Sequence, residues 1–390
     1  MQKGGDVKRL RNIVDKIKPT FSEGGKLSWL QSTFEAFETF LFTPNTVTRR
    51  GSHIRDAVDM KRSMITVVIA LMPPLLFGMW NIGAQHYGAL DVQMGLWGNF
   101  IFGLVRMLPM IAVSYIVGLA IEFSFAQVRK HEVNEGFLVT GLIIPMIVPV
   151  TTPLWQLALA VAFAVVIGKE VFGGTGMNFL NPALVARAFL FFAYPTHMSG
   201  DGVWTAAKWW GTDAIAGPTP LGEMMTNVQR PSASLIDMFV GTIAGSTCET
   251  STVAILIGAM ILLGSGIASW RTMLSVVIGG GVMGIVFNLI GTNDYMRLPF
   301  YYHYVMGGFM FGAVFMATDP VTSAQTNIGK WIYGLLIGAF AVLLRVMNPA
   351  YPEGMMLSIL LMNCFAPLID HCVVAMNIRK RKKRWKEVRR

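Results

Sequence analysis

Long apolar runs constrain the fold of this chain more than any other feature. Hydrophobic residues make up 53% of its 390 residues, and charged residues make up only 14%. Several runs approach the roughly 20 residues that a helix needs to cross about 30 Å of hydrocarbon. With the turn signals between them, the runs give ten candidate membrane spans, 64–82, 101–124, 137–152, 154–171, 183–196, 253–268, 273–291, 304–318, 331–347 and 355–376.

These runs contain no long alternation of apolar and polar residues, so helices rather than the strands of a membrane barrel are expected to satisfy their backbone groups. We therefore predict an all-α fold, that of a polytopic integral membrane protein with about ten transmembrane helices. Pro145, Pro149 and Pro153 interrupt the third to fifth spans, where kinked or half-membrane helices are expected.

Basic residues flank both ends of the membrane region. Arg62 and four further Lys or Arg residues lie shortly before the first span, and the run Arg379–Arg384 follows the last. The positive-inside rule then places both termini in the cytoplasm, which requires an even number of spans. The formal net charge of +10 is explained by anionic membrane lipid, and nucleic acid is not expected as a partner.

This threading divides the chain into five segments. The two membrane halves are expected to hold about five helices each. Met177–Ala183 faintly resembles Met347–Ala350, so an inverted repeat of five plus five helices is one expectation. The segments are a cytoplasmic N-terminal segment 1–63, a first membrane half 64–196, an extracytoplasmic loop region 197–252, a second membrane half 253–376 and a basic cytoplasmic tail 377–390.

Acidic residues at membrane depth are costly, so each is a functional candidate. Glu170 has Lys169 and Arg187 as candidate partners, and an ion pair and a functional role both stay open for it. Asp370 is expected to be unpaired within the last span, which favours a cation ligand or a proton carrier. Asp319 is either functional or a cap of the following helix. The candidate acids are Glu122, Glu170, Glu249, Asp319 and Asp370.

Two further patterns are less specific. Gly173–Gly176 is either a tight turn between two spans or part of a flavin, quinone or ion site, and it lacks the Lys-Ser/Thr of a P-loop. Cys248, Cys364 and Cys372 are far apart in the sequence. They predict buried free thiols rather than a disulfide or a metal centre.

A polar loop carries the most specific motif. The stretch Asp213–Thr219 resembles Asp-x-x-Ser/Thr-Gly-Ala-Thr, at which a flavin transferase joins the last Thr hydroxyl to the phosphate of FMN. Ala216 and Pro218 depart from that signature, whereas the acceptor hydroxyl is retained. The threading places the loop outside the cytoplasm, where a secreted flavin transferase can reach it. The alternative acceptors are Thr250 and Thr252.

Further motifs extend this resemblance over nearly the whole chain, which is similar to the B subunits of the bacterial sodium-translocating NADH:quinone oxidoreductases. The resemblance implies one covalent FMN, a riboflavin within the membrane part, a ubiquinone or menaquinone site near the cytoplasmic side and a coupled sodium path. The motifs that carry it are Arg129–Phe137, Lys169–Gly176, Asn178–Leu184, Met316–Pro320 and Asn348–Gly354.

Matched residue by residue, the resemblance assigns the FMN to Thr219, with Asp213 and Gly217 in its motif. It assigns quinone and inhibitor binding to Gly118, and Leu119 stands where the family often has a second glycine. The acids that it implicates in sodium uptake are Glu122, Asp319 and Asp370.

The same resemblance implies the partners. The chain has no soluble nucleotide-binding domain, so NADH oxidation is expected in a separate subunit of a six-subunit complex in the bacterial inner membrane, with subunits A, C, D, E and F as partners. Two alternatives stay open at this point. One is the homologous D subunit of the ferredoxin:NAD oxidoreductase complex, and the other is a channel or transporter without a redox role.

Overall fold

The protein is described from a computed structural model. It describes residues 60–129, 136–198, 219–224, 230–348 and 354–388, with the short stretches 11–12, 14–20, 50–52, 205–206 and 215–216 and the single residues 34 and 48. Helices dominate these residues, and the two strands, β1 (Thr205–Ala206) and β2 (Ile215–Ala216), form one short antiparallel pair. The predicted all-α polytopic fold is confirmed.

Six helices in the described part of the chain are long and apolar enough to cross a membrane. One of them, α6, reaches that length because the 3-10 helix η2 (Glu170–Phe172) continues it. The six are α3 (Met60–Ala89), α4 (Leu96–Arg129), α6 (Leu154–Gly168), α12 (Trp270–Ile290), α16 (Asn327–Met347) and α17 (Gly354–Val388).

Three further apolar helices are shorter, namely α5 (Phe137–Ile147), α7 (Pro182–Ala193) and α11 (Thr252–Gly264). The short α5 and α7 agree with the half-membrane helices expected at the third and fifth spans, whereas α6, at the fourth, is long enough to cross together with η2. The short helices outside these spans are α8 (Pro195–Met198), α9 (Pro220–Glu223), α10 (Leu235–Val240) and α13 (Asp294–Arg297).

The expected span 304–318 is not one continuous helix. It is divided into α14 (Tyr302–Val305), α15 (Phe309–Phe311) and the π-helix η5 (Gly312–Met316). Gly307 interrupts the helix with a positive φ of 61°. A Cβ atom on Gly308 would lie 2.7 Å from a carboxylate oxygen of Glu249, so the break lets the backbone approach a buried charge.

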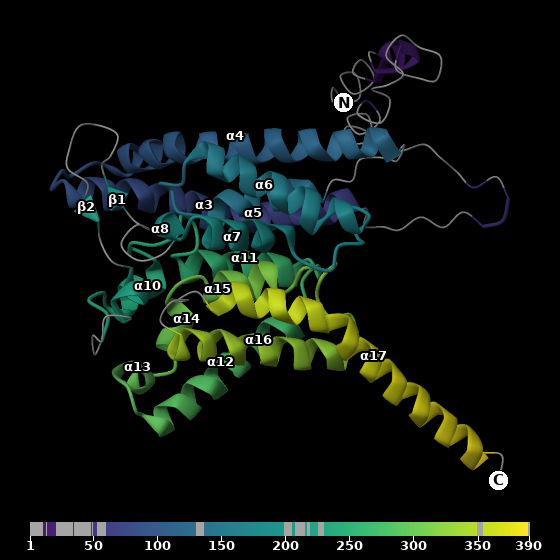
Figure 1. The fold of residues 1–390 in the computed structure, drawn as a ribbon. Helices are drawn as coiled ribbons and strands as arrows, with labels where there is room; N and C mark the ends of the chain where they lie inside the picture. The colour runs from purple at the N-terminus through teal and green to yellow at the C-terminus, as the bar shows by residue number, and fades with distance from the viewer. Residues whose placement is uncertain are drawn as a thin grey trace, which may run out of the picture.

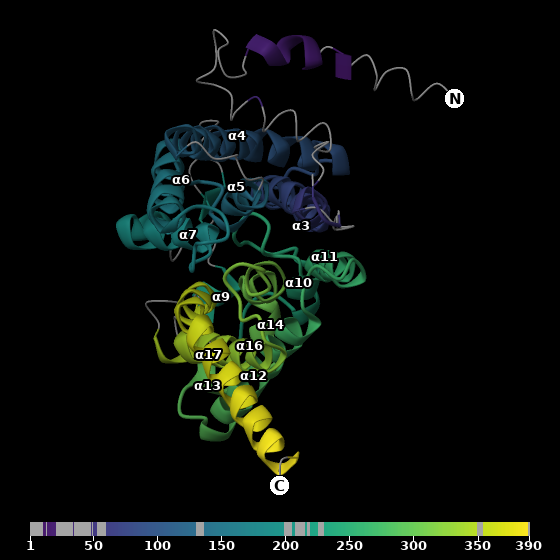
Figure 2. The same cartoon turned by 90° about the vertical axis from the view of Figure 1, so that its right-hand side faces the viewer.

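The two halves repeat one packing arrangement. In the first half α4 packs against α5 and α6, and α6 packs against α7; in the second half α12 packs against η5 and α16, and α16 packs against α17. Figure 2 shows these groups as separate layers, and α11 returns to pack against α3. The helix α7 runs towards α8, whereas α17 runs in the opposite direction, as an inverted repeat requires (Figure 1).

The two ends of the helical bundle differ in what they carry. The helix α3 begins, and α17 ends, on the right in Figure 1, whereas α8, α10, α13 and the β1–β2 pair lie on the left. The first and last long helices therefore enter and leave from the same side, which requires an even number of crossings.

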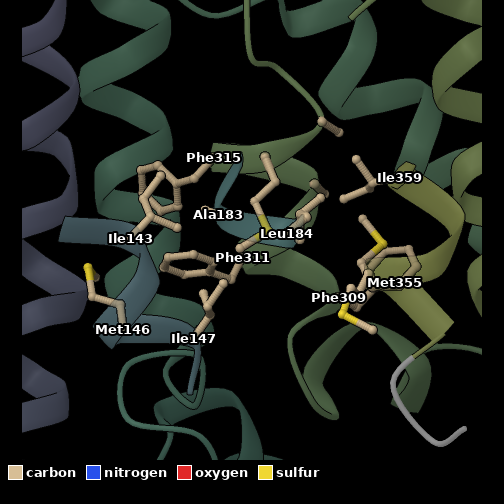
Figure 3. Close-up of a cluster of buried hydrophobic side chains, with 14 of the residues drawn as sticks. Ile143, Met146, Ile147, Ala183, Leu184, Phe309, Phe311, Phe315, Met355 and Ile359 are labelled. Carbon is tan, nitrogen blue, oxygen red and sulfur yellow. The ribbon is translucent and has the colours of Figure 1, made fainter. Parts of the chain in front are cut away.

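The apolar core lies where the short and broken helices meet. Figure 3 shows Phe311 and Phe315 of α15 and η5 beside Ile143 and Ile147 of α5, with Leu184 of α7 close by. All five side chains are buried. Their close packing keeps the interrupted helices in register, because interiors of this density resist changes in volume.

Candidate functional site

A cavity of about 120 Å³ lies among the start of α3, the first turns of α5 and α7, the end of α11 and the segment after η5. Most of its wall is apolar, with Val139, Ile143 and Phe315 among the lining residues. The polar residues on its wall are Ser63, Thr140, Lys169, Thr175, Asn178, Asn181, Thr318 and Asp319. The cavity therefore combines apolar surface with one cation, one anion and several neutral donors.

Asn181 fixes the start of α7 and joins the two halves at this cavity. Its side-chain oxygen accepts hydrogen bonds from the N–H groups of Ala183 and Leu184 at 3.0 and 3.4 Å. Pro182 occupies the first helical position, where its missing N–H costs nothing. The Asn181 amide also donates to Asp319 Oδ2 at 3.3 Å, which links α7 to the segment after η5.

Asp319 is partly buried and accepts three hydrogen bonds. Besides Asn181, its donors are the Val321 N–H at 3.1 Å and the Thr322 hydroxyl at 2.9 Å. Burial raises the pKa of the Asp319 carboxyl, and these three hydrogen bonds act against that rise. Asp319 therefore organises the turn before α16, and it is also the one carboxylate on the cavity wall.

The glycine-rich segment is a tight turn. Gly173, Gly174 and Gly176 all have positive φ, and the first two donate N–H bonds to the Glu170 and Lys169 carbonyls at 3.1 Å each. This turn closes the chain after η2 and places Thr175 on the cavity wall. The segment therefore contributes to the candidate site through the side chain of Thr175, which lies within the turn.

Two ion pairs stand beside the cavity, and their pairing differs from the sequence expectation. Glu122 of α4 accepts from the Lys169 ammonium, and both side chains are 4% exposed. Glu170 pairs with Arg129, at 3.1 Å, rather than with Lys169 or Arg187. Arg129 also donates to the Glu170 carbonyl at 2.7 Å. Each buried carboxylate thus has its own cation, as burial demands.

Asp370 is not the unpaired carboxylate that the sequence predicted. It accepts from the backbone N–H groups of Gln325 and Thr326 at 2.6 and 3.0 Å, and from the Thr326 hydroxyl at 2.5 Å. Thr326 is the N-cap of α16. Asp370 therefore joins α17 to the start of α16, where negative charge is favourable.

Gly118 lies in close contact with Phe137, the first residue of α5. A Cβ atom on Gly118 would stand 1.9 Å from the Phe137 ring. The ring is fully buried and meets Tyr115 edge to face, with centroids 6.3 Å apart. Leu119 packs at the edge of the core. Neither Gly118 nor Leu119 lines the cavity.

Thr219 caps the short helix α9. Its hydroxyl oxygen accepts from the Gly222 N–H at 3.1 Å, and its side chain is half-buried. The alternative acceptors Thr250 and Thr252 are both buried, with 6% and 5% of their surface exposed. Of the three, Thr219 is therefore the most open to an enzyme. Asp213 and Gly217 lie outside the described residues.

A third ion pair, with both side chains buried, joins α7 to the segment before α11. Arg187 of α7 donates to Glu249 at 2.6 Å and to the Ser246 hydroxyl at 3.3 Å. Arg345 of α16 is also buried and donates to the His303 carbonyl at 2.8 Å. The sequence indicates Glu249 as a candidate acid, but it does not indicate that Arg187 is its partner.

The segment 241–251 enters the bundle in an irregular conformation before α11 begins. Thr247 there lies within hydrogen-bond distance of three carbonyl oxygens at the end of α5, those of Pro145 and Met146 at 2.8 Å and of Val148 at 3.0 Å. The Cys248 N–H also donates to Met146 at 3.1 Å. The end of this half-membrane helix is therefore satisfied by protein, as the membrane interior requires.

In the described part of the chain, no group of three or more His, Cys, Asp or Glu residues could hold a metal ion. All three cysteines are free thiols, but only Cys248 is buried, whereas Cys364 and Cys372 are exposed. The prediction of burial was wrong for these two because α17 presents them on its outer surface.

Sequence reasoning alone did not find the roles of Lys169, Asn178 and Asn181. The Asn-Pro pair was a usable signal, because Asn at an N-cap with Pro at the next position marks a helix start. Lys169 gave no such signal, because its partner Glu122 is 47 positions away.

The fold and the site define a class, that of polytopic helical membrane proteins with interrupted helices, buried charge pairs and a repeated half. The chain belongs to the NQR2, RnfD, RnfE family, whose model matches residues 47–379.

Three relatives are named as the B subunit of Na(+)-translocating NADH-quinone reductase. The chain is 50% identical to that of Stutzerimonas stutzeri (strain A1501) over 95% of this chain and 98% of the relative. It is 48% identical to that of Azotobacter vinelandii over 95% and 98%. It is 46% identical to that of Neisseria meningitidis over 96% and 99%.

Proposed function

We propose that this chain is the B subunit, in the membrane, of a sodium-translocating NADH:quinone reductase, which passes electrons to quinone as Na⁺ leaves the cell. The observation that carries the proposal is the identity of 46–50% to subunits of that name along almost the whole chain. The buried carboxylates at the end of the bundle support an ion-handling role. These relatives favour the quinone-reducing complex over the ferredoxin-dependent one.

The test is assembly of the chain with subunits A, C, D, E and F in bacterial inner membranes. Sodium-stimulated reduction of quinone by NADH is the expected result. Ferredoxin-dependent reduction of NAD⁺ by the assembled complex would contradict the proposal, and so would sodium flux without any electron transfer.

The same proposal gives the chain a direction in the membrane. The end where α3 begins and α17 ends lies beside the basic run Arg379–Arg384, and we place it in the cytoplasm by the positive-inside rule. The end with α8 and α10 then faces outwards. A cysteine-labelling reagent that does not cross membranes should reach Asp237→Cys in α10 and fail to reach Lys386→Cys in α17.

Thr219 is the proposed acceptor of FMN. Its hydroxyl is half-exposed, and its oxygen would still accept the Gly222 N–H after esterification. The bound group supplies redox chemistry, and the loop supplies its attachment. Denatured protein made with a flavin transferase should fluoresce on a gel, and Thr219→Ala should abolish the band. A band that persists in Thr219→Ala and disappears in Thr250→Ala would move the acceptor to Thr250.

The cavity wall has the donors that a riboflavin ring system needs. Asn178 and Asn181 each use one amide N–H internally, towards Leu180 and Asp319, which leaves the second N–H of each for a ligand. Val139 supplies apolar contact. The volume of about 120 Å³ is smaller than three fused rings, so riboflavin would require the wall to open.

Asn181→Ser tests this placement because Ser keeps an N-cap oxygen but removes the amide. Acid extraction of the purified complex should release less non-covalent flavin from this variant than from the parent. Thr219→Ala should leave the extractable flavin unchanged. Equal release from Asn181→Ser and the parent would remove the cavity from consideration.

We also propose that Glu122, Asp319 and Asp370 act in sodium uptake, and that Gly118 and Leu119 act in quinone binding. Asp319 lines the cavity directly, whereas Glu122 is linked to it through its ion pair with Lys169. Half-saturating Na⁺ and quinone concentrations, measured for single variants in the assembled complex, separate these roles.

A further inference from the structure

Lys169 faces two environments. Its ammonium donates to Glu122, and its side chain also lines the cavity, although it is only 4% exposed. It follows the last residue of α6, and the C-cap conformation, with φ −131° and ψ −62°, turns the chain out of the helix there. A lysine at such a position can move its charge, because four rotatable bonds separate the ammonium from the backbone.

The Glu122 carboxylate is neutralised by Lys169 and not by the other nearby cation, Arg129. Arg129 is already paired with Glu170, at 3.1 Å, and donates to its carbonyl as well. Lys169 is the one cation on the described cavity wall, and Asp319 is the one anion. A cation that arrives at Glu122 therefore competes with the Lys169 ammonium. The displaced ammonium has another carboxylate, that of Asp319, on the wall of the cavity that Lys169 itself lines.

Burial makes this competition strict. A carboxylate that is 4% exposed cannot stay ionised without a neighbouring positive charge, because removing one partner of a buried pair leaves the cost of desolvating the other uncompensated. Either Lys169 or another cation must accompany the Glu122 carboxylate. The two occupants exclude each other if they use the same oxygen atoms.

We propose that Lys169 is a tethered competitor for Na⁺ at Glu122, and that it turns towards Asp319 when Na⁺ binds. The inference rests on the proposed function, because it takes Glu122 as a sodium residue. No bond is made or broken, and no electron or proton moves in this step; one positive charge replaces another. Lys169 is thus a positioning residue that sets the concentration of Na⁺ at which Glu122 is occupied.

Two substitutions at Lys169 separate this role from simple structural support. Lys169→Gln removes the competing charge, so Na⁺ should bind at a concentration at least tenfold lower than in the parent complex. Lys169→Arg keeps the charge and can hold Glu122 through two parallel hydrogen bonds, so half-saturation should move to a higher concentration. A residue with only a structural role would weaken Na⁺ binding in both variants.

The measurement is equilibrium binding of radioactive ²²Na⁺ to the purified oxidised complex, with sodium-dependent quinone reduction as a second readout. Arg297→Gln is the control because this arginine of α13 is 68% exposed and lies at the opposite end of the bundle, so its half-saturating Na⁺ concentration should stay within twofold of the parent. If Lys169→Gln does not assemble, an unchanged or lower half-saturating concentration in Lys169→Arg overturns the inference.

The controls also distinguish this inference from the proposed function. A parent complex that reduces quinone without any dependence on Na⁺ would remove the proposed function itself. If Glu122→Gln leaves Na⁺ binding unchanged, Glu122 is not a sodium residue and the inference fails with that assignment. If Glu122→Gln weakens binding and Lys169→Gln does not strengthen it, the proposed function stands and the tethered competitor is wrong.

Discussion

Asp370 accepts hydrogen bonds from both the backbone N–H and the hydroxyl of Thr326, at 3.0 and 2.5 Å. These contacts hold α17 against the start of α16, 44 positions away in the sequence. Because the Asp370 carboxylate accepts three hydrogen bonds, its loss is expected to affect stability as well as any role in sodium uptake. Variants must therefore be assessed for stability and for sodium binding separately.

Asp370→Ala should lower the free energy of unfolding by about 1–3 kcal/mol, because the N–H groups of Gln325 and Thr326 lose their acceptor. Thermal unfolding of the assembled complex measures the effect. Asp370→Asn keeps one acceptor oxygen and should lose less. If Asp370→Asn keeps its stability and its half-saturating Na⁺ concentration, Asp370 is a cap of α16 and not a sodium residue.

The ion pair between Arg187 and Glu249 should be sensitive to the loss of either partner. Both side chains are 5% exposed, so Glu249→Gln or Arg187→Met leaves a buried charge without its counter-charge and costs about 3–5 kcal/mol. The double variant Arg187→Met/Glu249→Met removes both charges and should be more stable than either single variant. Yield of folded protein and thermal unfolding in detergent measure this.

The stability of the double variant can also contradict this prediction. If the double variant is as unstable as the sum of the two single variants, the two residues act independently and the pair is not what stabilises the contact between α7 and the segment before α11. The exposed pair Lys383–Glu387, at 4.0 Å, is the control. Its substitution should change stability by less than about 1 kcal/mol.

The close contact at Gly118 gives a prediction that is independent of its assignment to quinone. A methyl group at this position would stand 1.9 Å from the Phe137 ring, so Gly118→Ala should cost about 1–3 kcal/mol through overpacking. Gly118→Ala/Phe137→Leu should recover most of this loss. Inhibitor binding, measured on both variants, then shows whether the ring or the glycine forms the quinone site.

Gly98 is the matched control in the same helix. A Cβ atom there would meet only the flexible Met94 side chain, at 3.5 Å, so Gly98→Ala should be neutral or stabilise the protein by up to about 1 kcal/mol through helix propensity. Equal destabilisation by the two alanines would show that the Phe137 contact is not the cause.

The helical fold could be predicted because apolar length and proline position are local signals. Pro145 and Pro149 correctly indicated that α5 is short, since proline removes a backbone donor and disturbs the preceding turn. The interruption of the expected span 304–318 was not predicted. At the interruption Gly308 lies against Glu249, and that contact joins two segments that only the folded chain brings together.

The candidate site was predicted less completely for the same reason. Glu122 and Asp319 were recognisable from the cost of acids in apolar segments, but their partners Lys169 and Asn181 lie 47 and 138 positions away. Charge patterning favours neighbours in sequence, so it paired Glu170 with Lys169 and not with Arg129. Such pairings follow from how the helices pack.

Thr247 gives the last prediction, because its single hydroxyl lies against the buried carbonyl end of α5. Its oxygen lies 2.8 Å from the carbonyl oxygens of Pro145 and Met146. Thr247→Val keeps the shape and removes the donor, which should cost about 1–3 kcal/mol at a buried helix end, whereas Thr247→Ser should stay close to the parent. Thermal unfolding of the two variants compares them directly. Equal stability of Val and Ser at this position would mean that the Cys248 N–H, at 3.1 Å from the Met146 oxygen, satisfies the helix end without the hydroxyl.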